Sequence, residues 1–207
     1  DLDPKIDMRW DDTEDGKTEF TGFHRIERYL FPPKAEQIGE AEGQVAPADA
    51  ANAKTADTKE AIDKVADQLV ADVKALKAEV DNPDFQFETQ MFVRGPQALI
   101  DEIAKTKVGG EEDRYSHTDM WDIAANIDGS ETLIAELQPI IVKHDPKLMD
   151  KITAQFADVR TFIEQFREGD GYVSYDKVTV EQRRELSDKV DALSATLSMV
   201  PGIVMQK

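Results

Sequence analysis

The sequence predicts an all-α fold, a bundle of five or six long helices. Apolar residues recur every three or four positions along several stretches, and proline and glycine punctuate those stretches. No convincing pair of alternating strands appears in the sequence. The clearest apolar stripe consists of Ile62, Val65, Leu69, Val73, Leu76 and Val80. Helices with one apolar face bury that face against other helices, so this pattern indicates a helical bundle.

The N-terminal part is expected to contain two helices. Residues 1–15 hold a proline and the acidic cluster "DDTEDG" and are expected to be irregular. A helix is predicted over 18–31, where "FPPK" stops it because proline cannot continue a helix. The Ala/Glu/Gly/Gln-rich segment 34–53 predicts a loop, and the apolar stripe predicts a helix over 55–80 that ends at "DNPD".

The C-terminal part is expected to contain the remaining helices. Gly95-Pro96 is expected to break or kink the next region into two helical pieces, and "VGG" ends the second piece. Further helices are predicted from 116 to the segment before "HDPK", over 146–168 and over 179–198. The segment "GDGYVSYDKVT" predicts a loop with a short strand.

We expect residues 1–207 to form a single domain. The chain has no internal repeat and no clear linker, and 40% of its residues are hydrophobic, enough for a real core. It opens on "DLDPKIDMRW" without a methionine, which we interpret as a processed or truncated product.

The composition excludes several classes of function. The chain carries 43 acidic against 25 basic residues, a formal charge of -18, which repels nucleic acids and anionic membranes and attracts cations. It has no cysteine, so thiolate metal sites, disulfides and cysteine nucleophiles are excluded. Nitrogen and oxygen ligands favour harder or borderline ions such as iron, zinc, manganese or calcium. No run of about 18 apolar residues predicts a membrane span.

The pair His24 and Glu27 is the first candidate for a metal site. Residues three apart share one helix face, so both side chains could reach one ion. The surrounding "TGFHRIERYLF" is largely apolar, which favours an inward-facing helix between its neighbours. In so acidic a chain, however, an HxxE pair also arises by chance. A solvated pair, or a histidine bonded to the backbone, is the alternative reading of the spacing.

No catalytic residue is indicated. The zinc-protease motif HExxH, glycine-rich phosphate loops and nucleophile elbows are all absent from the sequence. Carboxylates are so numerous that choosing two of them for acid–base chemistry would be arbitrary.

The chain resembles a known family in four ordered blocks. "GFHRIE" is similar to the GxHxxE signature of the imelysin-domain (M75 peptidase-like) family. "DLDPKIDMR", "FETQMFVRGPQALIDEIA" and "YSHTDMWDIAANIDGSETLI" resemble the EfeO/EfeM branch of that family, in the same order, and together cover nearly the whole chain. That branch is the extracytoplasmic component of a bacterial iron-uptake system.

The resemblance implies a particular version of the helical bundle. It implies an imelysin-like domain of two up-down bundle halves, with a metal site in the cleft between them. Complete family members carry further helices before "DLDPKID", so the chain is expected to be N-terminally truncated relative to the family, with an incomplete first half. Apolar surface exposed on that half would favour a dimer through the truncated face.

The resemblance also implies a set of ligands. His24 and Glu27 fall on the signature ligands, and Asp7 and Glu88 fall on acidic positions that face the cleft in related proteins. One imidazole with three carboxylates suits ferrous or ferric iron and also accepts zinc or copper. As alternatives, Asp7 caps the turn after Pro4, and Glu88 is an exposed charge at a helix start.

Two further residues are candidates for supporting the ligands. His117 is a candidate second-shell residue of the cleft, although Ser116 and Asp119 around it also predict a capping box at a helix start. Arg94 is a candidate partner of a cleft carboxylate, with a plain surface arginine as the alternative.

The resemblance implies a non-enzymatic iron-binding function. The chain would bind iron in the periplasm or outside the cell, from a precursor that could be membrane-anchored. It would pass the ion to a membrane iron permease or a peroxidase-like partner of the uptake system. Two alternatives stay open: an M75-type metallopeptidase, and a helical partner-binding module that uses no metal.

Overall fold

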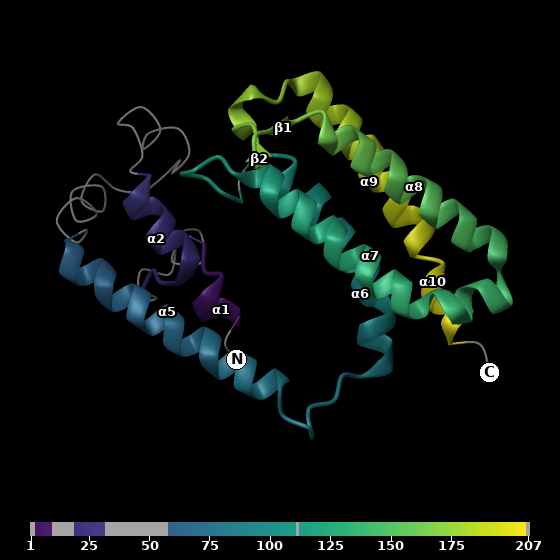
Figure 1. The fold of residues 1–207 in the computed structure, drawn as a ribbon, viewed down its shortest axis with the longest axis horizontal. Helices are drawn as coiled ribbons and strands as arrows, with labels where there is room; N and C mark the ends of the chain where they lie inside the picture. Colours follow the sequence, from purple (N-terminus) through teal and green to yellow (C-terminus); the bar gives the residue numbers. More distant parts are fainter. Residues whose placement is uncertain (1–2, 10–18, 32–57, 111, 206–207) are drawn as a thin grey trace. The chain divides into compact units, whose positions relative to one another are not determined.

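The structure is a computed structural model that describes residues 3–9, 19–31, 58–110 and 112–205. Nearly all of its regular structure is helical, so the predicted all-α class is confirmed (Figure 1). The predicted loop 34–53 lies outside the described residues. The chain divides into two compact units, residues 1–85 and 86–207, which are described separately below. That the two units are parts of one domain stays a prediction.

The described residues of the first unit form three helices that contact one another: α1 (Asp3–Ile6), α2 (Gly22–Leu30) and α5 (Lys59–Val80). Helix α1 shows that the expectation of an irregular start was wrong at residues 3–6. Helix α2 begins later than predicted, at Gly22 instead of residue 18. Gly22 has a φ of 81°, and a Cβ atom there would lie 2.3 Å from the carbonyl oxygen of Ile6. The close approach of α1 and α2 therefore requires glycine at the start of α2.

Helix α5 buries only part of its apolar stripe. Thr58 caps the helix by accepting a hydrogen bond from the amide of Ala61 at 3.2 Å. Ile62 and Leu69 in the N-terminal half of the stripe are buried. The C-terminal half is exposed, at Val73, Leu76 and Val80. The predicted exposure of the first bundle half through truncation stays a prediction.

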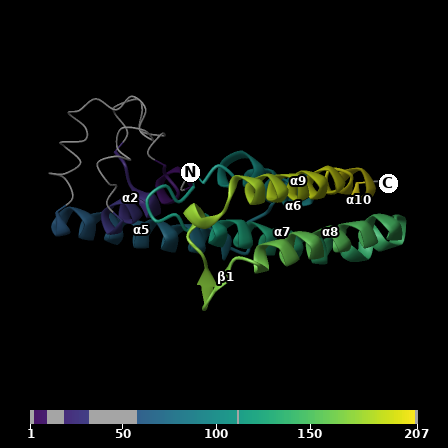
Figure 2. The ribbon, with the colours of Figure 1, turned by 90° about the horizontal axis from the view of Figure 1, so that it is seen from above.

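The second unit is a closed four-helix bundle. Each helix contacts the next along the chain, and the first contacts the last (Figures 1 and 2). The four helices are α6 (Thr89–Glu102), α7 (Asp119–His144), α8 (Pro146–Glu164) and α9 (Val180–Leu197). A π-helical segment, η2 (Ile103–Lys107), continues α6, and a short helix, α10 (Val200–Val204), follows α9. The predicted apolar faces of α8 and α9 form much of the core.

Of the predicted break or kink at Gly95-Pro96, the break was wrong, because α6 runs through both residues, and the kink stays a prediction. A Cβ atom on Gly95 would lie 2.9 Å from the Leu133 side chain of α7, so this glycine permits close packing of two helices. The hydroxyl of Ser130 on α7 donates to the carbonyl of Pro96 at 2.9 Å. Tight packing against α7 thus stabilises the helix across a proline that would end an isolated one.

A short hairpin joins α8 to α9. Strand β1 (Arg167–Glu168) pairs antiparallel with β2 (Gly171–Tyr172), and a 3₁₀ turn, η3 (Tyr175–Lys177), follows. The hairpin confirms the predicted short strand. Helix α8 ends at Glu164, four residues before the predicted end at 168. No described helix is long and apolar enough to cross a membrane.

Candidate metal site

Helix α2 presents its polar residues to the interior of the protein. His24, Arg25 and Arg28 are buried, whereas Phe23 and Leu30 are 55% and 62% exposed. This is the reverse of the usual arrangement, in which a helix buries its apolar face. Burying a histidine is costly unless its ring nitrogens are hydrogen-bonded. The groups that bond to the His24 ring nitrogens therefore show why the polar face of α2 is buried.

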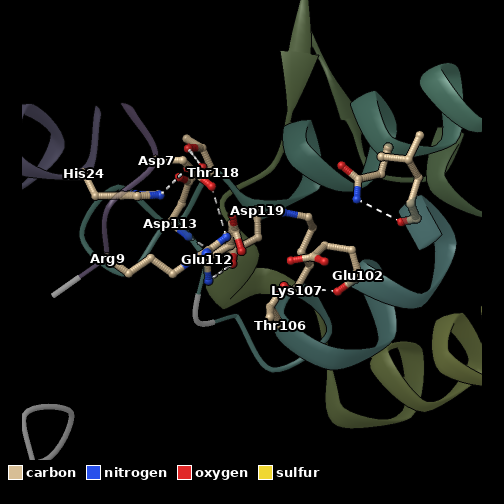
Figure 3. Close-up of polar contacts among 12 residues, drawn as sticks. Asp7, Arg9, His24, Glu102, Thr106, Lys107, Glu112, Asp113, Thr118 and Asp119 are labelled. Atoms are coloured by element: carbon tan, nitrogen blue, oxygen red, sulfur yellow. Dashed lines mark hydrogen bonds and ion pairs between the residues drawn. The ribbon is translucent and has the colours of Figure 1, made fainter. Parts of the chain in front are cut away.

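The structure brings together three of the four predicted ligands. The Nδ1 atom of His24 lies 3.0 Å from Oε2 of Glu27, one helical turn further along α2. The Nε2 atom of the same ring lies 3.2 Å from Oδ1 of Asp7, which directly follows α1 (Figure 3). The imidazole is thus held between two carboxylates, one at each nitrogen. The side chain of Arg9 contacts the other oxygen of Asp7 at 3.4 Å.

The two carboxylates keep the imidazole charged. Burial alone would lower the pKa of His24, but hydrogen bonds and negative charges from Asp7 and Glu27 outweigh it and raise the pKa to about 10. In the metal-free state at neutral pH, the ring is therefore an imidazolium that donates to both carboxylates. If a metal cation replaced one of the two ring protons, a ring nitrogen and a carboxylate oxygen would already be positioned to bind it.

The geometry assigns different tasks to the two carboxylates. The two nitrogens of an imidazole point away from each other, so a single ion cannot lie beside both of them. An ion bound at one nitrogen shares that side with one carboxylate, and the other carboxylate accepts the remaining ring N–H. A carboxylate in that outer position fixes the orientation of a metal-binding histidine and makes it a stronger ligand.

Glu88 and Arg94 lie in the second unit. Glu88 is the residue before α6, is exposed, and makes no side-chain capping bond to the helix. Arg94 is exposed on α6. The roles predicted for both residues, a fourth ligand and a partner of a carboxylate, stay predictions.

His117 is a turn residue of the second unit. Its φ of 57° is unusual for a residue other than glycine, and its carbonyl accepts a hydrogen bond from the amide of Tyr175 at 2.9 Å. Its Nδ1 atom lies 3.6 Å from a carboxylate oxygen of Asp176. That His117 supports the metal ligands without binding the ion itself stays a prediction.

The alternative reading of this segment as a capping box was wrong. Thr118 precedes α7, and the hydroxyl of Ser116 lies 2.9 Å from that of Thr118. Asp119 does not cap α7, because its Oδ1 atom accepts hydrogen bonds from the amides of Glu112 and Asp113.

A cluster of buried charges around the start of α7 was missed in the sequence. Lys107 and Glu112 form an ion pair at 3.0 Å, and both side chains are almost completely buried. Asp119 is completely buried nearby (Figure 3). The segment "GGEEDRYSHTDMWD" does not by itself indicate a buried charge cluster, because acidic residues are common throughout the chain.

The imelysin (Peptidase_M75) family model matches residues 1–200. The chain belongs to the imelysin family. This imelysin chain is 37% identical to "Iron uptake system component EfeO" of Escherichia coli O1:K1 / APEC over 206 residues. It is 36% identical to the proteins of the same name from Escherichia coli K12 and Shigella flexneri. In each case the match covers 99% of the chain and 48% of the relative, so the chain spans about half the length of the relatives it matches.

Proposed function

We propose that the protein is a metal-binding component of an iron-uptake system and binds iron through His24, Glu27 and Asp7. The observation that carries the proposal is the buried His24 ring with a carboxylate at each nitrogen. The matched relatives are named as components of an iron-uptake system, which supports iron as the cargo.

The chemistry of the three side chains supports iron. An imidazole nitrogen and carboxylate oxygens form a hard-to-borderline ligand set, which suits ferrous or ferric iron and also accepts zinc or copper. The formal charge of -18 raises the concentration of cations near the surface. The GxHxxE signature makes His24 and Glu27 the first choice for direct ligands, with Asp7 accepting the second N–H of the ring.

The site is open to exchange on one side. The Asp7 side chain is 47% exposed, whereas those of His24 and Glu27 are 9% and 11% exposed. The side chains of His24 and Glu27 do not complete the coordination sphere of iron, so water or further protein ligands must supply the rest. Glu88 remains our candidate for a further ligand, and a cleft between helices remains the predicted setting. An incomplete protein coordination sphere suits a cargo ion that must be released to the next component.

The proposal places the protein outside the cytoplasm, in the periplasm or at the cell surface. The components that receive the iron would be a membrane permease and a peroxidase-like protein. We propose no enzymatic activity, because no base or nucleophile beside the three ligands is marked by the sequence. A dimer through the truncated face stays a prediction.

The test is a calorimetric titration of Fe²⁺ under anaerobic conditions into the full chain and its variants. We expect His24→Ala, which removes a direct ligand, to lower the affinity by more than the roughly 10–100-fold that loss of an outer partner of a ligand costs. His144→Ala is the matched control, because His144 is exposed at the far end of α7. If His24→Ala binds Fe²⁺ as tightly as the wild type, the site assignment is wrong.

Two further variants show which carboxylate binds the ion directly and which one orients the His24 ring. Glu27→Gln and Asp7→Asn keep the size of each side chain and remove its charge. The variant that loses a direct ligand should lose more affinity than the one that loses only the partner of the ring N–H, and we expect the larger loss for Glu27→Gln. The opposite order would place the ion beside Asp7.

The two alternative functions give different results in the same set of proteins. Hydrolysis of a peptide library by the wild type, abolished by Glu27→Gln, would establish the metallopeptidase. Failure of the wild type to bind iron, zinc or copper would favour the metal-free partner-binding module.

A further inference from the structure

Trp121 is a large aromatic side chain on the surface of the second unit. It lies in the first turn of α7 and is 49% exposed. Tryptophan is highly buried on average in folded proteins, so half exposure of this side chain is unusual. Tryptophan and tyrosine are enriched at protein interfaces, where part of the ring packs against its own protein and part meets the partner. The contacts of Trp121 therefore show whether this ring is suited to binding.

The hairpin that joins α8 to α9 holds the Trp121 ring in place, and Figure 1 shows β2 beside the start of α7. The ring of Tyr172 in β2 packs edge-to-face with that of Trp121, with the ring centres 5.4 Å apart. A Cβ atom on Gly171 would lie 2.4 Å from the Trp121 ring, so the ring packs directly on the backbone of β2. The exposed ring is therefore ordered before any partner binds, which lowers the entropic cost of binding through it.

An arginine of the protein already stacks on the neighbouring ring. The guanidinium carbon of Arg167 lies 4.3 Å from the centre of the Tyr172 ring. Cations are attracted to the faces of aromatic rings, and tryptophan attracts them most strongly. Among the described residues, no arginine or lysine occupies the Trp121 ring in the same way. The strongest cation-binding ring of this aromatic pair thus remains available to a cation from another molecule.

The charges around the hairpin favour a positively charged partner. Every basic side chain of residues 160–177 already lies in an ion pair, in the pairs Arg160–Asp128, Arg160–Glu131, Arg167–Glu164 and Lys177–Glu168. Asp170, at the tip of the hairpin, is exposed and has no ion pair among the described residues. The whole chain carries a formal charge of -18, which attracts basic partners and repels acidic ones.

We propose that Trp121 and the β1–β2 hairpin form a docking surface for a partner protein that places a lysine or arginine side chain against the Trp121 ring. Tryptophan, tyrosine and arginine are the residue types that contribute most to the energy of protein interfaces, and all three occur here. The cation of the partner binds the ring, and the Asp170 carboxylate steers the basic segment toward the hairpin. The proposal does not depend on iron binding.

Nitrogen-15 NMR of the full chain, titrated with a hexa-arginine peptide at about 0.15 M salt, tests the surface in the wild type. The indole N–H signal of Trp121 is assigned from the spectrum of Trp121→Leu. We expect this signal and the amide signals of β1 and β2 to shift together as the peptide binds, whereas a hexa-glutamate peptide leaves them unchanged. Shifts confined to acidic segments away from the hairpin would overturn the proposal. The same hairpin shifts on concentrating the protein without peptide would assign the surface to a second copy of the chain, and would also overturn it.

The affinity of two variants separates the ring from the net charge. Trp121→Leu keeps every charge of the chain, and we expect it to weaken binding of the hexa-arginine peptide at least about threefold. Phe87→Leu is the matched control, because Phe87 is another exposed aromatic residue of the second unit, and it should bind the peptide like the wild type. Equal affinity of Trp121→Leu and the wild type would mean that the net charge alone attracts the peptide, and would overturn the proposal. An equal loss in both variants would overturn it too.

Discussion

The proton held by His24 gives the sharpest quantitative prediction. The perturbation is a rise in pH from 6 to 10 in the absence of metal. Because the folded-state pKa of His24 is raised from 6.5 to about 10, protonation of the ring stabilises the folded state. This contribution is complete below pH 6.5 and is lost as the pH rises through about 10.

The magnitude follows from the size of the pKa difference. Each pKa unit corresponds to about 1.4 kcal/mol, so a shift of this size is equivalent to about 5 kcal/mol at most. The Asp7 carboxylate is 47% exposed, and solvent screening weakens its contribution. We therefore expect His24 protonation to contribute about 2–3 kcal/mol to the free energy of unfolding below pH 6.5.

The assay combines NMR of the histidine rings with urea unfolding. The ring nitrogens of His24, assigned from the spectrum of His24→Gln, should keep the shifts of an imidazolium up to at least pH 8.5. The free energy of unfolding should fall between pH 6.5 and 10 by more in the wild type than in His24→Gln. A His24 ring that becomes neutral at or below pH 6.5 would refute the reasoning, because the two carboxylates would then not control its charge.

Three substitutions test the surrounding framework. Gly22→Ala should cost about 1–3 kcal/mol through its positive φ, with an added clash against α1, and should weaken iron binding; unchanged stability would contradict the close approach of α1 and α2. Thr179→Ala removes the capping box of α9 and should lower the free energy of unfolding by about 1 kcal/mol while leaving iron affinity unchanged; a loss of affinity would show that the second unit affects the site. Tyr175→Phe removes a 2.9 Å hydrogen bond to the Val108 carbonyl and should cost about 1 kcal/mol in urea unfolding, whereas no cost would mean that water replaces the hydroxyl.

Helix periodicity made much of the bundle predictable. The apolar stripes of α8 and α9 place the buried residues correctly, because a helix with one apolar face has one way to bury it. The continuity of α6 through Gly95-Pro96 was not predicted. It depends on the packing of Gly95 against Leu133, and the two residues are distant in sequence. The positive φ of Gly22 and the short helix α1 depend on the same kind of distant contact.

The site was predictable only in part, for a related reason. The spacing of His24 and Glu27 places both on one face of a helix, and the structure shows them in contact. Asp7 is 17 residues from His24, so its contact could be expected only from the family resemblance. The buried charges of Lys107, Glu112 and Asp119 were missed because burial, and not residue type, distinguishes these side chains from the many exposed charged residues.

In the proposed site, iron takes the place of a proton on His24. Calorimetry of Fe²⁺ binding at pH 7, carried out anaerobically in buffers of different ionisation enthalpy, measures the protons released for each ion bound. We expect the release of about one proton per ion in the wild type, because the ring is an imidazolium before the metal binds. His24→Gln should release none. Tight binding of Fe²⁺ by the wild type without proton release would contradict the account.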